Sequence, residues 1–110
     1  MPDLYPPDLL REALSLDPAD EQAAHALIRH LAGLLSFYTH ELPKSILVDD
    51  TEEWRRELDE FEQLIARHPV NRDYSVDLWG WRFHCDAWES YLRRKDDFAS
   101  YTEFLADRYT

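Results

Sequence analysis

The sequence predicts an all-α protein, a compact bundle of four to five helices, and three observations support this fold class. Apolar residues recur at spacings of three and four along several segments, which is the periodicity of amphipathic helices. No stretch of alternating apolar and polar residues is long enough for a convincing strand. The 110 residues include only two glycines, too few for a chain of tight hairpins. A chain of this length forms one domain, here residues 1–110.

Prolines and acidic residues delimit the first two helices. Pro6-Pro7 followed by residues 8–14 indicates a short first helix with proline in its first turn. It stops near Leu16, because Asp17 precedes a proline and therefore disfavours the helical conformation. A long helix is expected over residues 18–41, with Asp17 as its N-cap. Gly33 lies inside this helix, where glycine costs about 1 kcal/mol, and we interpret it as a point of close helix packing.

Three more helices are expected over residues 51–68, 75–95 and 98–109. In the last of them, Ser100 and Glu103 have the spacing of a capping box. The apolar stripes of all these helices form the predicted core. Its members are Leu27, Leu31, Leu35, Trp54, Leu58, Phe61, Trp81, Trp88 and Leu105. An apolar island, Ile46-Leu47-Val48, is expected to pack under the bundle.

The net charge of −11 is unevenly distributed along the chain. Residues 1–21 carry six acids against one arginine, and residues 49–62 carry eight acids against two arginines. Such a surface argues against nucleic acid or an anionic membrane as a direct ligand, because both require basic residues. It fits a basic protein partner, or a solvated face that only keeps the protein in solution.

The sequence predicts no catalytic residues, no metal site and no cofactor. The nearest approach to a helical metal motif is Glu21 followed by His25, which occurs once and at the wrong spacing. His84 and Cys85 are neighbours, but adjacent helical residues point about 100° apart and cannot form a dyad. We expect Cys85 to be a buried structural thiol, and we expect the protein not to be an enzyme.

An aromatic cluster in the fourth helix is the most unusual feature of the sequence. Trp79 and Trp81 are two residues apart and cannot both face the core. The cluster is either core throughout, or its outer members are exposed, as anchors of binding sites often are. We predict a partner-binding surface in which two aromatic anchors accompany the acids of the third helix. Its residues are Glu52, Glu53, Glu57, Asp59, Glu60, Trp79 and Tyr91.

Two resemblances bear on fold and function. The segment Ala13-Leu14-Ser15-Leu16-Asp17-Pro18 resembles the turn between two tetratricopeptide units, which implies a helix–turn–helix there. In size, acidity and helical content the chain resembles bacterial toxin-immunity proteins of the colicin and contact-dependent-inhibition type. That resemblance implies a small cytoplasmic inhibitor that caps a basic toxin domain. The N-terminal residues fit a cytoplasmic location, since they lack the basic and apolar regions of a signal peptide.

Two other function classes remain open on the sequence alone. One is an adaptor or scaffold domain that associates with its own copy through the aromatic edge of the fourth helix. The other is a small enzyme with a carboxylate site, which would need a concave pocket lined by converging acids and a histidine. The oligomeric state and the identity of the partner do not follow from the sequence.

Overall fold

The computed structural model describes residues 6–41 and 51–109, and all structural statements below concern this part of the chain. It contains five α-helices and no strand, so the all-α prediction is confirmed. The helices are α1 (Pro7–Leu16), α2 (Glu21–Glu41), α3 (Thr51–Arg67), α4 (Ser75–Arg93) and α5 (Tyr101–Tyr109), with a 3₁₀ turn η3 (Lys95–Asp97) before α5. The apolar island at residues 46–48 lies outside the described residues.

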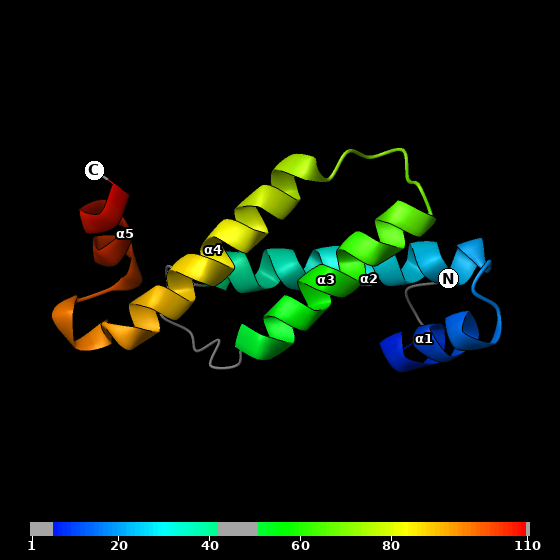
Figure 1. Ribbon diagram of the computed structural model, residues 1–110, viewed down its shortest axis with the longest axis horizontal. Helices are drawn as coiled ribbons and strands as arrows, with labels where there is room; N and C mark the ends of the chain where they lie inside the picture. The colour runs from blue at the N-terminus through cyan, green and yellow to red at the C-terminus, as the bar shows by residue number, and fades with distance from the viewer. Residues whose placement is uncertain (1–5, 42–50, 110) are drawn as a thin grey trace.

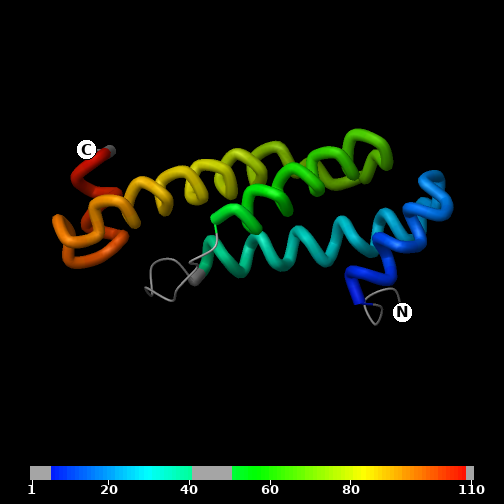
Figure 2. The backbone as a smooth tube through the Cα atoms, turned by 60° about the horizontal axis from the view of Figure 1, so that its bottom comes forward, coloured from blue at the N-terminus to red at the C-terminus, as the bar shows by residue number. Residues whose placement is uncertain are grey.

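Helix α2 is the centre of the bundle, because α1, α3 and α4 all pack against it. In Figure 1, α3 and α4 run obliquely across α2, and α1 folds back beside its first half. Helix α5 packs on the C-terminal half of α4, at the far end from α1. Figure 2 shows α3 and α4 together on one side of α2, so the bundle is long and narrow, 49 × 23 × 20 Å.

The core follows the predicted stripes in α2, α3 and α4. Eight of the nine predicted core residues are buried, and the exception is Leu105, which is only partly buried. Tyr101 and Phe104 fill the inner side of α5 instead. The predicted start of α5, at residue 98, was three residues too early, since the helix begins at Tyr101.

Side-chain caps explain where two helices begin. The Asp20 carboxylate accepts the backbone N–H of Ala23 at 3.1 Å, so α2 starts at Glu21 and not at Pro18 as predicted. Asp17, the predicted cap, instead accepts the N–H of Ala19 at 3.1 Å within the preceding turn. At α5, the Ser100 hydroxyl accepts the N–H of Glu103 at 3.2 Å, the bond that capping-box spacing predicts.

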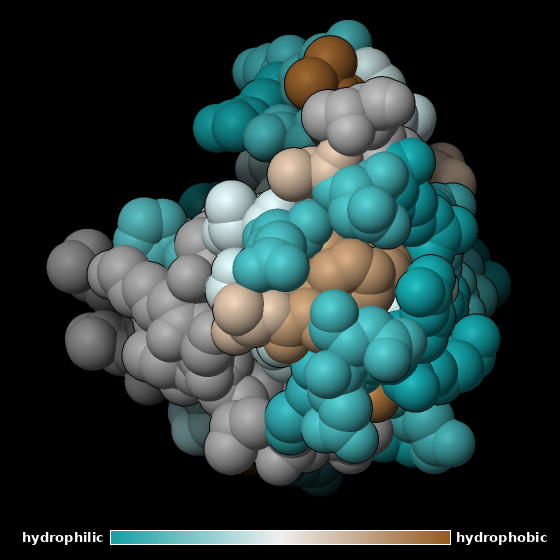
Figure 3. All heavy atoms as spheres, turned by 90° about the vertical axis from the view of Figure 1, so that its left-hand side faces the viewer, coloured by the Kyte–Doolittle hydropathy of each residue, from teal (hydrophilic) through white to brown (hydrophobic). Residues whose placement is uncertain are grey.

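The outer surface is mostly hydrophilic. Seen from the α5 end, hydrophilic residues cover most of the coloured surface and surround a smaller apolar area (Figure 3). Gly33 belongs to this outer surface of α2, and a Cβ atom placed there would meet no atom within 4 Å. The interpretation of Gly33 as a point of close helix packing was therefore wrong.

Because open space surrounds Gly33, its replacement tests helix propensity alone. Gly33→Ala should raise the free energy of unfolding by about 0.5–1 kcal/mol, since alanine loses less backbone entropy in a helix. Chemical denaturation of the wild type and the variant measures this difference. A loss of stability would mean that another helix approaches α2 at this position.

Two tryptophans of α4 test which side of this helix faces the core. Trp88 is 2% exposed and Trp79 is 70% exposed. Trp88→Ala should lower the free energy of unfolding by about 3–5 kcal/mol, because it leaves a large cavity. The matched control Trp79→Ala should cost under about 1 kcal/mol. Equal losses in denaturation experiments would contradict this orientation of α4.

Candidate functional site

A cleft of about 660 Å³ lies between α1, α2 and α3, and we call it the acidic cleft. Five carboxylates face two guanidinium groups in its wall, and four of the carboxylates are predicted partner-binding residues. His30 and Leu34 of α2 complete the inner side. The lining residues are Pro7, Asp8, Arg11, His30, Leu34, Glu53, Arg56, Glu57, Asp59, Glu60 and Gln63.

An ion pair between α1 and α3 closes one end of the acidic cleft. The guanidinium of Arg11 donates to both carboxylate oxygens of Glu60, at 2.8 and 2.9 Å, and also to Asp8 at 3.1 Å. Such a two-point contact is geometrically specific and holds α1 against α3. The hydrogen bond from Arg11 to Glu60 and the negative charge of Glu60 raise the pKa of Arg11 further above its ordinary value. Glu60 is therefore engaged within the protein.

Glu57 lies in the wall of the acidic cleft but not on the outer surface. Glu57 is only 6% exposed and lies between α2 and α3. The Tyr38 hydroxyl donates to Oε1 at 3.0 Å, whereas Oε2 is buried without any hydrogen-bond partner. Glu57 thus faces Tyr38 of α2 and is not exposed on the outer surface, and its role as a partner-binding residue stays a prediction.

Burial governs the ionisation of Glu57. Desolvation raises the pKa of this carboxyl group, the hydrogen bond from Tyr38 lowers it, and the nearby charge of Glu53 raises it again. The charge of Arg11 lowers the pKa of Glu57 and the charge of Glu60 raises it, and both effects are smaller. The net direction is upward, so ionisation of Glu57 is less favourable in the folded protein than in a fully solvated carboxyl group.

Arginines from α3 and α4 neutralise acids along the contact between these two helices. Arg82 donates to Glu62 at 2.6 Å and to Asp59 at 3.2 Å. Arg55 of α3 pairs with Asp86 at 2.6 Å and also with Glu89. Acids of α3 thus form ion pairs with arginines of α1 and α4, and the sequence of α3 alone does not reveal these partners. Among the predicted acids, Glu52 and Glu53 stay exposed on α3.

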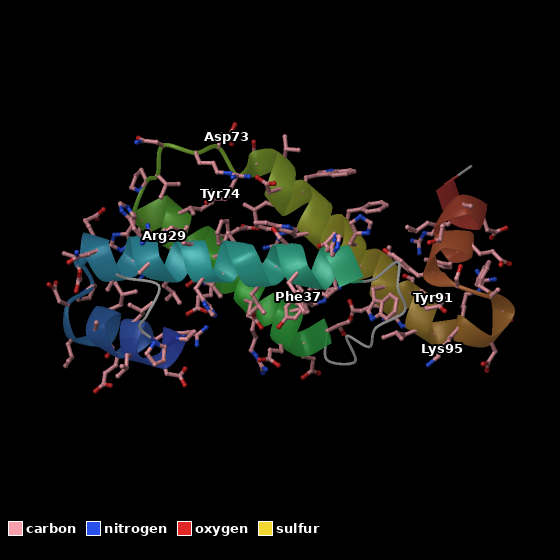
Figure 4. The ribbon with its side chains drawn as sticks, turned by 180° about the vertical axis from the view of Figure 1, so that it is seen from behind. Arg29, Phe37, Asp73, Tyr74, Tyr91 and Lys95 are labelled. Atoms are coloured by element: carbon pink, nitrogen blue, oxygen red, sulfur yellow. The ribbon has the colours of Figure 1, made fainter. Side chains whose placement is uncertain are left out.

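The two predicted aromatic anchors lie in opposite environments. Trp79 is exposed and stacks on Phe83, with ring centroids 5.3 Å apart. Tyr91 is 7% exposed and contacts the rings of Trp88, Tyr101 and Phe104. Figure 4 places Tyr91 where α4 meets α5. Because α5 covers this side of α4, Tyr91 is buried in the free protein, and its role as a binding anchor stays a prediction.

An exposed phenylalanine of α2 was not predicted as part of any surface. Phe37 is 57% exposed, one helical turn after Leu34 of the acidic cleft. In Figure 4 it lies on the side of α2 along which α1 also packs. Phe37 falls outside the apolar stripe of α2, so its helical position is the sequence signal that could have marked it as exposed.

A second polar cluster joins the start of α2 to the end of α3. The buried His68 places Nδ1 2.7 Å from Glu21 Oε1, and His25 Nε2 lies 3.4 Å from Glu21 Oε2. The sequence brings Glu21 and His25 together, but only the fold adds His68. Within residues 6–41 and 51–109, no group of three or more His, Cys, Asp or Glu side chains has an arrangement that could hold a metal ion.

The neighbours His84 and Cys85 do not face each other. His84 Nδ1 lies 2.9 Å from the Tyr101 hydroxyl of α5, and burial lowers the pKa of this histidine. Cys85 is buried in the core, and burial raises its pKa to about 11. The thiol therefore stays protonated near neutral pH and is a poor nucleophile.

Comparison of the chain with models of protein families, with curated proteins and with solved structures finds no match. Within the described part of the chain, no helix has the length and apolar character needed to cross a membrane. The candidate function is therefore argued from the acidic cleft and the exposed residues around it.

The raised pKa of Glu57 predicts how stability depends on pH. A group with a raised pKa stabilises the fold at low pH, and this contribution is lost as the pH rises through the raised value. Glu57→Gln keeps the neutral shape and should therefore melt at a higher temperature than the wild type at neutral pH. The difference should vanish well below the ordinary pKa of 4.5, where Glu57 is protonated in both folded and unfolded states.

Thermal unfolding across this pH range measures the effect. The matched control is Glu52→Gln, which removes one exposed charge from the same helix and should change stability by under about 0.5 kcal/mol. A Glu57→Gln variant that is less stable than the wild type at neutral pH would show that the ionised carboxylate is well solvated.

Proposed function

We propose that the protein binds a basic protein partner and acts as an immunity protein that neutralises a toxin domain in the cytoplasm. The observation that carries the proposal is the acidic cleft, where five carboxylates face two guanidinium groups in a space of about 660 Å³. One of these two groups, Arg11, is already held by Glu60 and Asp8. The field in the cleft therefore favours a cationic group of a partner.

The contact surface that we propose combines the cleft with exposed residues near it. Glu52 and Glu53 supply unburied charge on α3, and charges at the rim of an interface mainly raise the association rate. Trp79 is the candidate anchor, since it is three residues from Arg82 on α4 and Arg82 reaches Asp59 of α3. An exposed tryptophan beside acidic residues is typical of a binding surface.

A binding role is favoured over catalysis by the state of the reactive residues. The Cys85 thiol is buried and protonated, and His84 points to Tyr101 instead of to a nucleophile. An enzyme with a carboxylate site would need a histidine or second carboxyl group beside Glu57 at the reacting centre. His30 and four other carboxylates line the same cleft, but among the described residues none of them is hydrogen-bonded to Oε2 of Glu57.

A self-associating adaptor is the second candidate, and one observation favours it. Val76 and Trp79 are exposed on one side of α4, and Trp79 stacks on Phe83. Two copies that paired through this side would bury all three residues. The mass of the protein in solution at micromolar concentration separates the candidates, because a monomer contradicts an obligate dimer.

The immunity role is tested with the product of the gene next to the one that encodes this chain. We expect that product to arrest bacterial growth and co-expression of this chain to restore it. For the purified pair, the association rate should fall steeply with salt, because exposed charges are screened. Replacing Glu52 and Glu53 together by glutamine should slow association by about three- to tenfold at low salt.

The matched control replaces Asp96 and Asp107 by asparagine. Both aspartates are exposed near α5, at the end of the bundle far from α1, and this variant should associate as the wild type does. Continued growth arrest in the presence of the chain would contradict the immunity role. A rate that is independent of salt and of both double variants would contradict charge-guided binding.

A further inference from the structure

The most unusual group in the acidic cleft is the carboxylate of Glu57. It is more than nine-tenths buried, its Oε1 is held by Tyr38, and its Oε2 has no hydrogen-bond partner. A buried polar atom without a partner costs free energy, and native proteins satisfy nearly all such atoms. Glu57 lines the cleft, so a group that entered the cleft and displaced the atoms that cover Oε2 would be the partner that this oxygen lacks.

The surroundings of Glu57 select a cation. Glu53, Asp59 and Glu60 lie in the same wall and repel an anion. Of the two arginines in the wall, Arg11 is engaged by Glu60 and Asp8. Arg56 is exposed, and within the described part of the chain it forms no ion pair. The cleft thus has a buried acceptor at its wall and no internal cation committed to it.

The hydrogen bond from Tyr38 narrows the choice between the two common cationic side chains. Arginine binds carboxylates best through two parallel N–H bonds, one to each oxygen. Tyr38 already donates to Oε1, at 3.0 Å, and leaves one oxygen of Glu57 free. A compact ammonium needs only one oxygen, so the geometry suits lysine better than arginine.

The apolar part of the cleft also suits lysine. Leu34 lies in the wall together with Pro7, and their side chains offer apolar surface to the four methylene groups of a lysine stem. Oε2 itself is closed off from solvent in the free protein. Arg56 lines the cleft and is exposed, and exposed side chains in general change rotamer within nanoseconds, so this part of the wall is able to adapt to an entering group.

We propose that the acidic cleft receives one lysine side chain of the partner, and that Oε2 of Glu57 accepts a hydrogen bond from its ammonium group. This inference rests on the proposed function, because it names the residue of the basic partner that the cleft recognises. Glu57 is then a specificity residue, and Tyr38 positions its carboxylate. The exposed acids of α3 guide the partner to the protein, whereas Glu57 selects the side chain that is buried.

The test uses the full chain and a pentalysine amide peptide as the probe, at about 20 mM salt, where screening is weak. Calorimetry measures affinity, and the carbon chemical shift of the Glu57 carboxyl group reports contact directly. The wild type should bind the peptide, and this shift should move on binding. The same peptide with all its amines acetylated should not bind, and pentaarginine should move the Glu57 signal less.

Two variants of α3 that remove the same charge separate a lysine site from diffuse attraction. Glu57→Gln should weaken pentalysine binding by about tenfold, the effect of losing one charge-assisted hydrogen bond. Glu62→Gln, on α3 but outside the cleft, should weaken it by less than about twofold. Circular dichroism checks that both variants fold.

Three outcomes would overturn the lysine site. They are equal losses for the two variants, an unmoved Glu57 signal on binding, and binding of the acetylated peptide as tight as that of pentalysine. None of these three outcomes contradicts the proposed function, because growth rescue and the salt dependence of association test that function separately. Growth rescue that survives Glu57→Gln with unchanged affinity for the toxin would remove the lysine site and keep the immunity role.

Discussion

The apolar stripe of α2, from Ala24 to Leu35, is the constraint on which the rest of the described structure depends. α1, α3 and α4 all pack on this helix, and Leu27, Leu31 and Leu35 are almost completely buried. Each leucine that is fully buried contributes about 1.5–3 kcal/mol, so this helix supplies a large share of the apolar burial. Trp54 of α3 and Trp88 of α4 belong to the same core. The position of every cleft residue follows from how the other helices are placed against α2.

The acidic composition is compatible with this packing because arginines connect helices that are distant in sequence. Arg11 links α1 to α3, and Arg55 and Arg82 link α3 to α4. These pairs are partly exposed, and exposed pairs contribute little to stability individually. The main effect of these ion pairs is to hold acids of α3 at defined positions.

Glu57 departs from the pattern of a well-packed core. Native proteins usually satisfy every buried polar atom, and departures from this rule concentrate at functional positions. A leucine at this place would pack against Tyr38 without any cost of desolvation. The retention of a carboxylate with one free oxygen, at the wall of a cleft, is therefore consistent with selection for binding over stability. The same reasoning separates Glu57 from Glu60, whose two oxygens are both satisfied by Arg11.

The sequence by itself determined the helices and most of the core, because the spacing of apolar residues and the local caps are properties of neighbouring residues. Trp81 and Trp88 face inward and Trp79 faces outward, as their spacing in one helix requires. Only the tertiary structure decided which acids are free, because the arginines that neutralise them come from other helices. It also decided that Glu57 and Tyr91 are buried, since both face elements, α2 and α5, whose placement depends on packing between distant segments. The cleft itself has no counterpart in the sequence, because it exists only where three separate helices meet.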